Sequence, residues 1–225
     1  MMKTMTTADA TMANQQKKFP LGVALVAAAC ACAVLSVPAA AAKSPNYDTL
    51  DVEYAASNFD DGDIEFDVKT GVLNVSAQLL DNFFVTGGLR YGELDIKNLP
   101  GDFGNGLKVR EITLGVGGFV HLIEGAESPI ALDLAGRVFA LHSDLEDSTD
   151  KGWGAAFGPR MKIGDRWEVQ GEATYFDVGD DGVWEFGLRS NYELTDLVAV
   201  QAGVFTDEDG DSVTYTVGAR LNIGD

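Results

Sequence analysis

The sequence has little cysteine and little positive charge. Only two of its 225 residues are cysteine, Cys30 and Cys32, and both lie near the N-terminus. The rest of the chain therefore needs no disulfide to persist in an oxidising compartment. Lysine and arginine number 16 against 35 aspartates and glutamates, which gives a formal net charge of -19. A surface this acidic repels phosphate, and this excludes nucleic acid as a partner.

Long apolar runs are also absent, except for one near the N-terminus. Two lysines precede the apolar residues 21–37, and the run ends in a stretch of alanines. A basic segment, an apolar segment and a small-residue cleavage site together indicate a secretory signal peptide. We therefore expect residues 1–42 to be a signal peptide and residues 43–225 to form one mature domain. Two alternatives stay open, an N-terminal transmembrane anchor and a lipoprotein attachment site at Cys30.

Residues 43–225 lack a helical apolar period and instead alternate apolar and polar residues. Alternation of period two over segments of this length predicts strands. We expect ten strands, at residues 48–58, 65–79, 83–96, 108–122, 129–144, 152–163, 166–178, 183–194, 197–206 and 212–223. Eight strands are the alternative, if two segments merge or one stays unpaired.

The expected connections alternate between two lengths. Tight turns are expected at residues 80–82, 164–165 and 195–196, with a slightly longer one near Gly125. Longer acidic loops are expected at residues 58–63, 97–107, 144–152, 177–182 and 207–211. Transmembrane β-barrels are built with short turns at one end and longer loops at the other, so this arrangement favours such a barrel.

The two faces of the predicted strands differ in charge. In the strand expected at residues 129–144, Leu132 and Leu134 alternate with Asp133 and Arg137, and the central part of the apolar face carries no charge on any strand. An arginine facing lipid at mid-depth costs about 2–4 kcal/mol, whereas charges enclosed within a barrel are tolerated when they pair. We therefore predict that the apolar face points outward to lipid. Tyrosines and tryptophans near the ends of this face predict two aromatic girdles.

This pattern resembles that of the small outer-membrane β-barrel proteins of Gram-negative bacteria, the OmpA-like and porin-like barrels. The resemblance covers residues 43–225 and lies in the alternation. The last strand alternates over residues 213–223 as in that family but lacks the family's terminal aromatic residue. The resemblance implies an all-β, up-and-down antiparallel transmembrane barrel in the cell outer membrane. It also implies contact with outer-membrane lipid and lipopolysaccharide, and with the barrel-assembly machinery and periplasmic chaperones during biogenesis.

The candidate site is the charged interior. We expect five arginines to face seven carboxylates across the lumen, namely Arg90, Arg137, Arg160, Arg189 and Arg220 with Asp51, Glu53, Glu111, Asp133, Glu168, Glu172 and Glu185. Such a network either plugs a narrow lumen as a structural ladder or forms the charged constriction of a small channel, and both interpretations stay open. Inward glycines leave space in the lumen, and inward phenylalanines fill it.

Residues suited to catalysis or metal binding are scarce. The only histidines are His121 and His142. Adjacent residues on a strand point to opposite faces, so Ser143 is badly placed beside His142 for nucleophilic catalysis. The acidic run at residues 207–211 resembles half a calcium loop without its closing glutamate. We expect no enzyme activity, no catalytic residue, no cofactor and no metal.

The expected function is therefore a structural role in envelope integrity or a role in surface interactions. A narrow porin-like channel for small solutes or ions is the alternative, and an outer-membrane hydrolase is less favoured than either.

Overall fold

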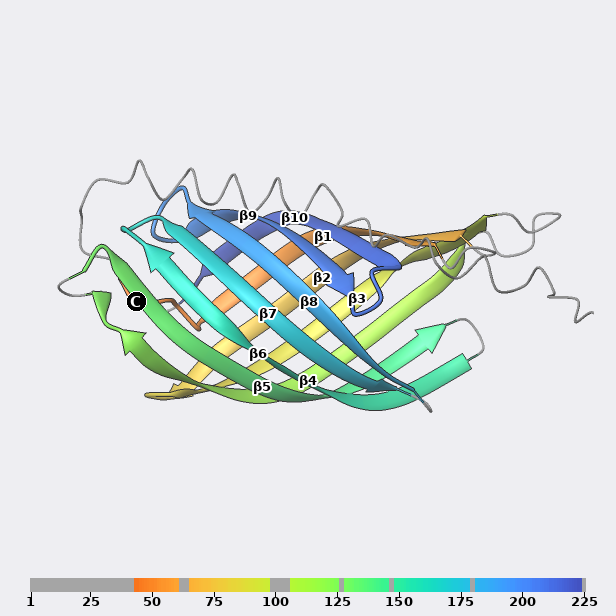
Figure 1. Ribbon diagram of the computed structural model, residues 1–225, viewed down its shortest axis with the longest axis horizontal. Coiled ribbons are helices and arrows are strands. Elements are labelled where there is room, and N and C mark those ends of the chain that lie inside the picture. Colours follow the sequence, from red (N-terminus) through yellow and green to blue (C-terminus); the bar gives the residue numbers. More distant parts are fainter. Residues whose placement is uncertain are drawn as a thin grey trace, which may run out of the picture.

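The computed structural model describes residues 43–60, 65–97, 106–125, 128–145, 148–178 and 181–223. These residues form ten antiparallel strands that close into a barrel, because β1 pairs with β10 as well as with β2 (Figure 1). Closure leaves no strand edge without a partner, as a bilayer requires. The ten strands expected from the alternation are confirmed. The predicted signal peptide lies outside the described residues.

The strands are long and nearly continuous along the chain. Their bounds are β1 (Thr49–Asp60), β2 (Glu65–Leu80), β3 (Phe83–Lys97), β4 (Leu107–Ile123), β5 (Ile130–Leu145), β6 (Ser148–Ile163), β7 (Trp167–Val178), β8 (Asp181–Glu193), β9 (Val198–Asp207) and β10 (Ser212–Asn222). Within the described part of the chain, no helix is long and apolar enough to cross a membrane.

Two connections predicted as long acidic loops, 144–152 and 177–182, are instead tight hairpins. β5 pairs with β6, and β7 with β8, until only two residues remain between the paired strands. Polar residues continue the ladder here, because backbone hydrogen bonding does not need apolar side chains, and the Thr149 hydroxyl donates to Asp144 across the pair at 2.9 Å. The prediction was wrong at these positions because it ended each strand where its apolar alternation ended.

The two ends of the barrel differ. The turn end carries the connections at residues 81–82, 124–129, 164–166 and 194–197, and the loop end is the opposite one. Residues 43–48, which we term the N-terminal segment, join β1 at the turn end. There the carbonyl of Asp48 accepts a hydrogen bond from the backbone amide of Ile223 at 2.8 Å.

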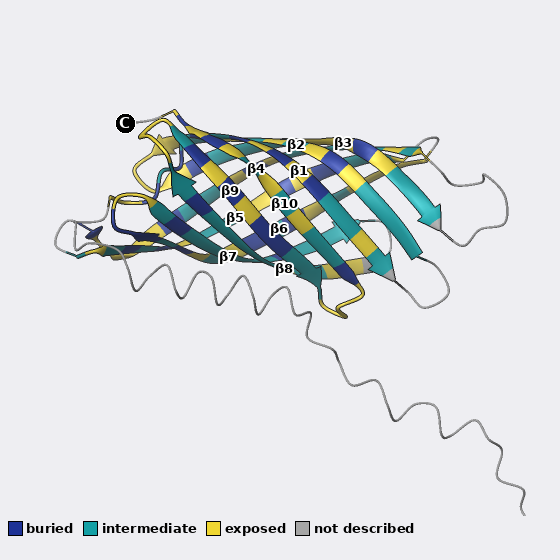
Figure 2. Cartoon of the chain, turned by 90° about the horizontal axis from the view of Figure 1, so that it is seen from above, coloured by how far each residue is buried: buried dark blue, intermediate teal, exposed yellow. Residues whose placement is uncertain are grey.

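The barrel carries its apolar side chains outside and its charges inside. Leu114, Val116 and Val217 are 71%, 58% and 59% exposed, whereas Asp133 and Lys162 are 0% and 3% exposed. Figure 2 shows buried and exposed positions alternating along the strands. The predicted outward orientation of the apolar face is confirmed, because a water-soluble barrel would bury these apolar side chains.

Aromatic side chains lie near both ends of the apolar surface. Toward the loop end the Trp153, Tyr175 and Trp184 rings follow one another with centroid distances of 5.7 and 5.3 Å. Toward the turn end Trp167 and Tyr192 lie 4.9 Å apart. These are the two girdles expected from the sequence, and they mark the heights at which a membrane barrel meets the lipid headgroups.

Inside the barrel, three phenylalanine rings lie against glycines of the neighbouring strand. The opposed pairs are Phe84 with Gly117, Phe139 with Gly154, and Phe205 with Gly187. In each pair the ring occupies the space that a Cβ on the glycine would need. These glycines therefore accept rings from across the ladder and do not widen the lumen.

Candidate functional site

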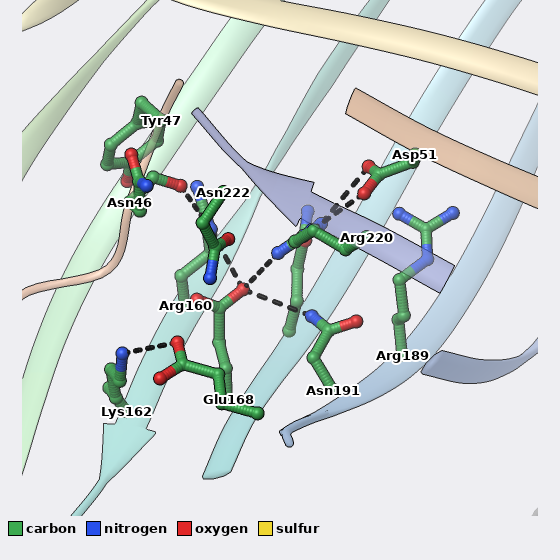
Figure 3. A network of polar contacts seen from close by, with 12 residues as sticks. Asn46, Tyr47, Asp51, Arg160, Lys162, Glu168, Arg189, Asn191, Arg220 and Asn222 are labelled. Atoms are coloured by element: carbon green, nitrogen blue, oxygen red, sulfur yellow. Dashed lines mark hydrogen bonds and ion pairs between the residues drawn. The ribbon is translucent and has the colours of Figure 1, made fainter. Parts of the chain in front are cut away.

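Glu168 on β7 is the centre of a buried polar network in the turn-end half of the lumen (Figure 3). Its Oε1 accepts hydrogen bonds from Arg160 and Arg220 at 2.8 Å each and from Asn191 at 3.2 Å. Arg220 also donates from Nε to Asp51 Oδ1 at 2.7 Å. These five side chains belong to residues only 2–6% exposed. Charges so far from water are tolerated because each has an oppositely charged partner.

The ladder register explains why the network forms at this height. Asp51 lies opposite Arg220 where the last strand closes on the first. Glu168 lies opposite Asn191 on one side and Lys162 on the other. All of these positions have the inward parity, so their side chains point into the lumen from β10, β1 and β6–β8, where Arg220 of β10 reaches Glu168 of β7.

A second ion pair extends this layer toward the turn end. Lys162 Nζ lies 2.6 Å from Glu193 Oε1, with the two side chains 4% and 13% exposed. Neither residue is among the interior charges predicted from the sequence. Parity identifies Lys162, which alternates with Met161 and Ile163 on β6, but Glu193 is the last residue of its strand and carries no such signal.

The N-terminal segment turns into the barrel and covers the network. The Tyr47 ring stacks on Phe119 with centroids 3.9 Å apart and lies 5.1 Å from Phe84. The Arg160 guanidinium lies over the Tyr47 ring, 4.3 Å from the ring centroid. Arg160 also donates to the backbone carbonyl of Asn46 at 2.9 Å. The segment is thus fixed by the same arginine that pairs with the buried carboxylate.

Asp133 is the acceptor for the Tyr47 hydroxyl, at 3.2 Å. Its other oxygen lies 2.7 Å from His121 Nδ1. Burial raises the pKa of the Tyr47 hydroxyl, which precedes β1, above its ordinary range. Tyr47 therefore stays a neutral donor, and Asp133 joins the N-terminal segment to β4 and β5.

A polar cavity of about 190 Å³ lies above this layer, toward the loop end. Its floor is formed by Tyr47, Arg160 and Arg220. Three wider ion pairs line it, at 3.1 Å for Arg137–Glu172, 3.2 Å for Arg189–Glu53 and 4.0 Å for Arg90–Glu111. Glu185 also lines the cavity, and no hydrogen bond or ion pair joins it to another described residue. The cavity is large enough and polar enough to hold several waters.

The twelve interior charges predicted from the sequence are placed in two groups by the structure. Ten of them line the cavity, and the other two, Asp133 and Glu168, are buried in the turn-end layer. The structure pairs Asp133 with His121 and Tyr47, and not with an arginine. Sequence reasoning missed the N-terminal segment, because Tyr47 precedes the first strand and shows no alternation.

The described candidates for catalysis do not form a triad of nucleophile, histidine and acid. His142 Nε2 lies 3.3 Å from Asp144 Oδ1 at the loop end. Ser143 lies on the other face of β5 and, among the described residues, has no hydrogen bond to either. The described part of the chain contains no group of three or more His, Cys, Asp or Glu residues that could hold a metal ion. The expected absence of enzyme activity stays a prediction.

Comparison with known proteins gives one family. Residues 27–193 match the family described as "Outer membrane protein beta-barrel domain". No curated protein matches the sequence significantly.

Similar solved structures include porins and an autotransporter domain. The KdgM porin in complex with disordered oligogalacturonate is 10% identical, with a TM-score of 0.45, over 78% of this chain and 99% of that one. The NanC porin is 11% identical, with a TM-score of 0.43, over 77% of this chain and 100% of that one. The β domain of the Bordetella autotransporter BrkA is 10% identical, with a TM-score of 0.48, over 78% and 98%.

Proposed function

Because this chain belongs to the family of outer membrane protein beta-barrel domains, we propose that it is an outer-membrane barrel sealed at its turn end. Its role is then structural, in envelope integrity or in contacts at the cell surface, and not the passage of solutes. Transmembrane barrels place short turns in the periplasm and longer loops outside. The sealed end accordingly faces the periplasm, and the cavity faces the cell exterior.

The observation that carries this proposal is the layer formed by Glu168, its arginine partners and the stacked Tyr47. An ion that crosses this layer has to separate buried ion pairs whose partner atoms are within 2.8 Å of one another. Depriving a buried charge of its partner costs about 3–5 kcal/mol. It also has to displace a ring packed between Phe119 and Arg160. Both barriers lie on the same path, which supports a closed resting state.

The test is single-channel conductance of the protein purified from outer membranes and inserted into a planar bilayer. The sealed barrel gives no discrete steps from wild type, while a mobility shift on heating shows that it is folded. Tyr47→Ala removes the ring that covers the layer, and we expect it to give brief, noisy openings. Tyr47→Phe keeps the ring and serves as the matched control that stays closed.

A second candidate function, a narrow channel, is favoured by the cavity of about 190 Å³ above the layer. In this case the N-terminal segment leaves the barrel and the cavity continues to the periplasm. Discrete, reproducible steps from wild type would overturn the sealed barrel and support the channel. The ion selectivity of Arg137→Gln against Glu172→Gln would then show which cavity charges the ions pass.

A further inference from the structure

On the outward faces of the strands, positive charge lies at the loop end of the barrel. Among the strand residues whose side chains the structure describes, the lysines and arginines of the outward parity lie only at the loop ends of three strands, as Lys69, Lys108, Arg110 and Lys151. All four residues are exposed. The described outward positions of β7–β10 include no lysine or arginine, so the positive surface covers one side of the barrel.

Three adjacent strands bring most of this charge together. We term Lys108 and Arg110 of β4, His142 of β5 and Lys151 of β6 the cationic rim. His142 lies directly opposite Lys151, and Arg110 lies opposite Asp144, one step diagonally from His142. Arg110 and Lys151 are two strands apart and offset by two residues along the strands, which places their Cα atoms roughly 12 Å apart, so their long side chains can reach one ligand between them.

The cations of the rim are not used within the protein. In the described part of the chain, Lys108, Arg110 and Lys151 form no ion pair, although Glu93 lies opposite Lys108 and Asp144 opposite Arg110. Asp144 Oδ1 is instead held by the Thr149 hydroxyl at 2.9 Å and His142 Nε2 at 3.3 Å. Three exposed cations therefore keep their charge available to a ligand outside the chain.

The rim lies at the height of the lipid headgroups. The outward apolar run of β4 extends from Ile112 to Leu122, which spans roughly 26 Å at about 3.4 Å per residue and a tilt of about 40°. This equals the thickness of the apolar band of outer-membrane barrels, about 25 Å. Arg110 is the next outward residue beyond that run, and Lys151 is the next beyond the girdle residue Trp153.

We propose that the cationic rim binds the phosphate groups of a phosphorylated outer-leaflet lipid of the lipopolysaccharide class. Phosphates at the membrane surface attract exposed lysine and arginine, and a bidentate arginine adds directional hydrogen bonds. The apolar surface and Trp153 directly below the rim contact the acyl chains of the same lipid. This inference concerns the outer surface, and it holds for a sealed barrel and for a channel alike.

The test measures lipopolysaccharide binding to the purified full barrel in a neutral detergent with a chelator present. The rim variant is Arg110→Gln with Lys151→Gln, and the matched control is Arg166→Gln with Lys43→Gln, which removes two exposed cations at the turn end. At about fivefold per cation, the rim variant binds roughly 30-fold more weakly than wild type, and the control binds like wild type. Enzymatically dephosphorylated lipopolysaccharide loses affinity for wild type by a similar factor.

Each of four other outcomes overturns the proposal. Equal losses of affinity in the rim variant and in the turn-end control show that binding depends on net charge and not on the rim. Unchanged affinity for the dephosphorylated lipid assigns binding to the acyl chains. Binding that disappears for wild type when the chelator is added assigns it to divalent cations on the acidic loops. Displacement of the lipid by an equal concentration of inorganic phosphate shows an anion site with no preference for lipid.

Discussion

The rings of Tyr47 and Phe119 are stacked with centroids 3.9 Å apart and planes within 4° of parallel. Tyr47 precedes the first strand, whereas Phe119 lies inside β4, so this contact attaches the start of the chain to the barrel wall. The Tyr47 hydroxyl and Asp133 add a hydrogen bond from the same ring to β5. One side chain thus decides if the turn end is covered, and its contribution can be measured separately from that of the strands.

Tyr47→Phe removes this hydroxyl and keeps the stack. Near pH 8 we expect it to lower the free energy of unfolding by about 1–2 kcal/mol, because Asp133 loses one donor. The raised pKa of Tyr47 makes the wild-type advantage depend on pH. Above the ordinary tyrosine value of 10.0, the unfolded chain releases this proton while the folded barrel retains it, so the advantage is present below pH 10 and is lost as the pH rises further.

The measurement is urea unfolding of both proteins in detergent micelles at several pH values on both sides of that value. The difference between them isolates Tyr47, because every other tyrosine and lysine is shared. A constant difference across the whole range would contradict the role of the buried hydroxyl.

Arg220→Gln tests the buried layer itself. The substitution leaves Asp51 without its ion-pair partner where β1 pairs with β10, and it leaves Glu168 with one arginine instead of two. We expect a loss of about 3–5 kcal/mol in the free energy of unfolding. Adding Asp51→Asn removes the orphaned carboxylate and recovers part of the loss. The matched control is Arg166→Gln, an exposed arginine in a turn, which changes stability by no more than about 0.5 kcal/mol. Equal free energies of unfolding for Arg220→Gln and Arg166→Gln would show that the ion pairs of Arg220 contribute nothing to stability.

Which charges face the lumen was predictable from the sequence, but most of their partners were not. Parity fixes the face of each strand residue, and this suffices for Arg137 and Glu172. These two residues lie on β5 and β7, which are not neighbours, and their 3.1 Å contact depends on how sharply the wall curves. Asp51 and Arg220 lie on neighbouring strands only because the barrel closes, so that pair could be predicted only together with the strand number.

The N-terminal segment and the loop-end pairings of β5 with β6 and of β7 with β8 show two further limits of alternation. Tyr47 has no strand pattern around it, and only docking into the finished barrel gives it a place. The hairpins continue as strands through polar residues, because the ladder outside the bilayer is held by the backbone and by contacts such as Thr149 with Asp144. Alternation therefore locates the membrane-facing part of a strand and not its end.

Gly187→Leu tests the packing of rings against glycines. A side chain at this position meets the Phe205 ring from the adjacent strand, and overpacking of this kind costs about 1–3 kcal/mol. Phe205→Ala in the same protein frees that space, so the double variant is more stable than the sum of the single changes by about 1 kcal/mol or more. The four proteins are compared by urea unfolding. Additive changes would show that Gly187 is required for its backbone and not for the ring.

Val116→Arg tests the orientation of the whole barrel. Val116 is 58% exposed, and in a water-soluble barrel an arginine at such a position changes stability by no more than about 0.5 kcal/mol. Facing the lipid near mid-depth, the same arginine costs about 2–4 kcal/mol. Ile112→Arg is the matched control, because it lies on the same face of β4 at the loop-end border of the apolar band, where the cost falls to about 0–1 kcal/mol.

Both variants are unfolded in phospholipid vesicles and again in detergent micelles. A cost that depends on depth, and that is larger in vesicles than in micelles, is expected if the outer face contacts a bilayer. Equal costs at the two positions in vesicles would contradict it, since both positions lie on the outward face of β4 at different depths.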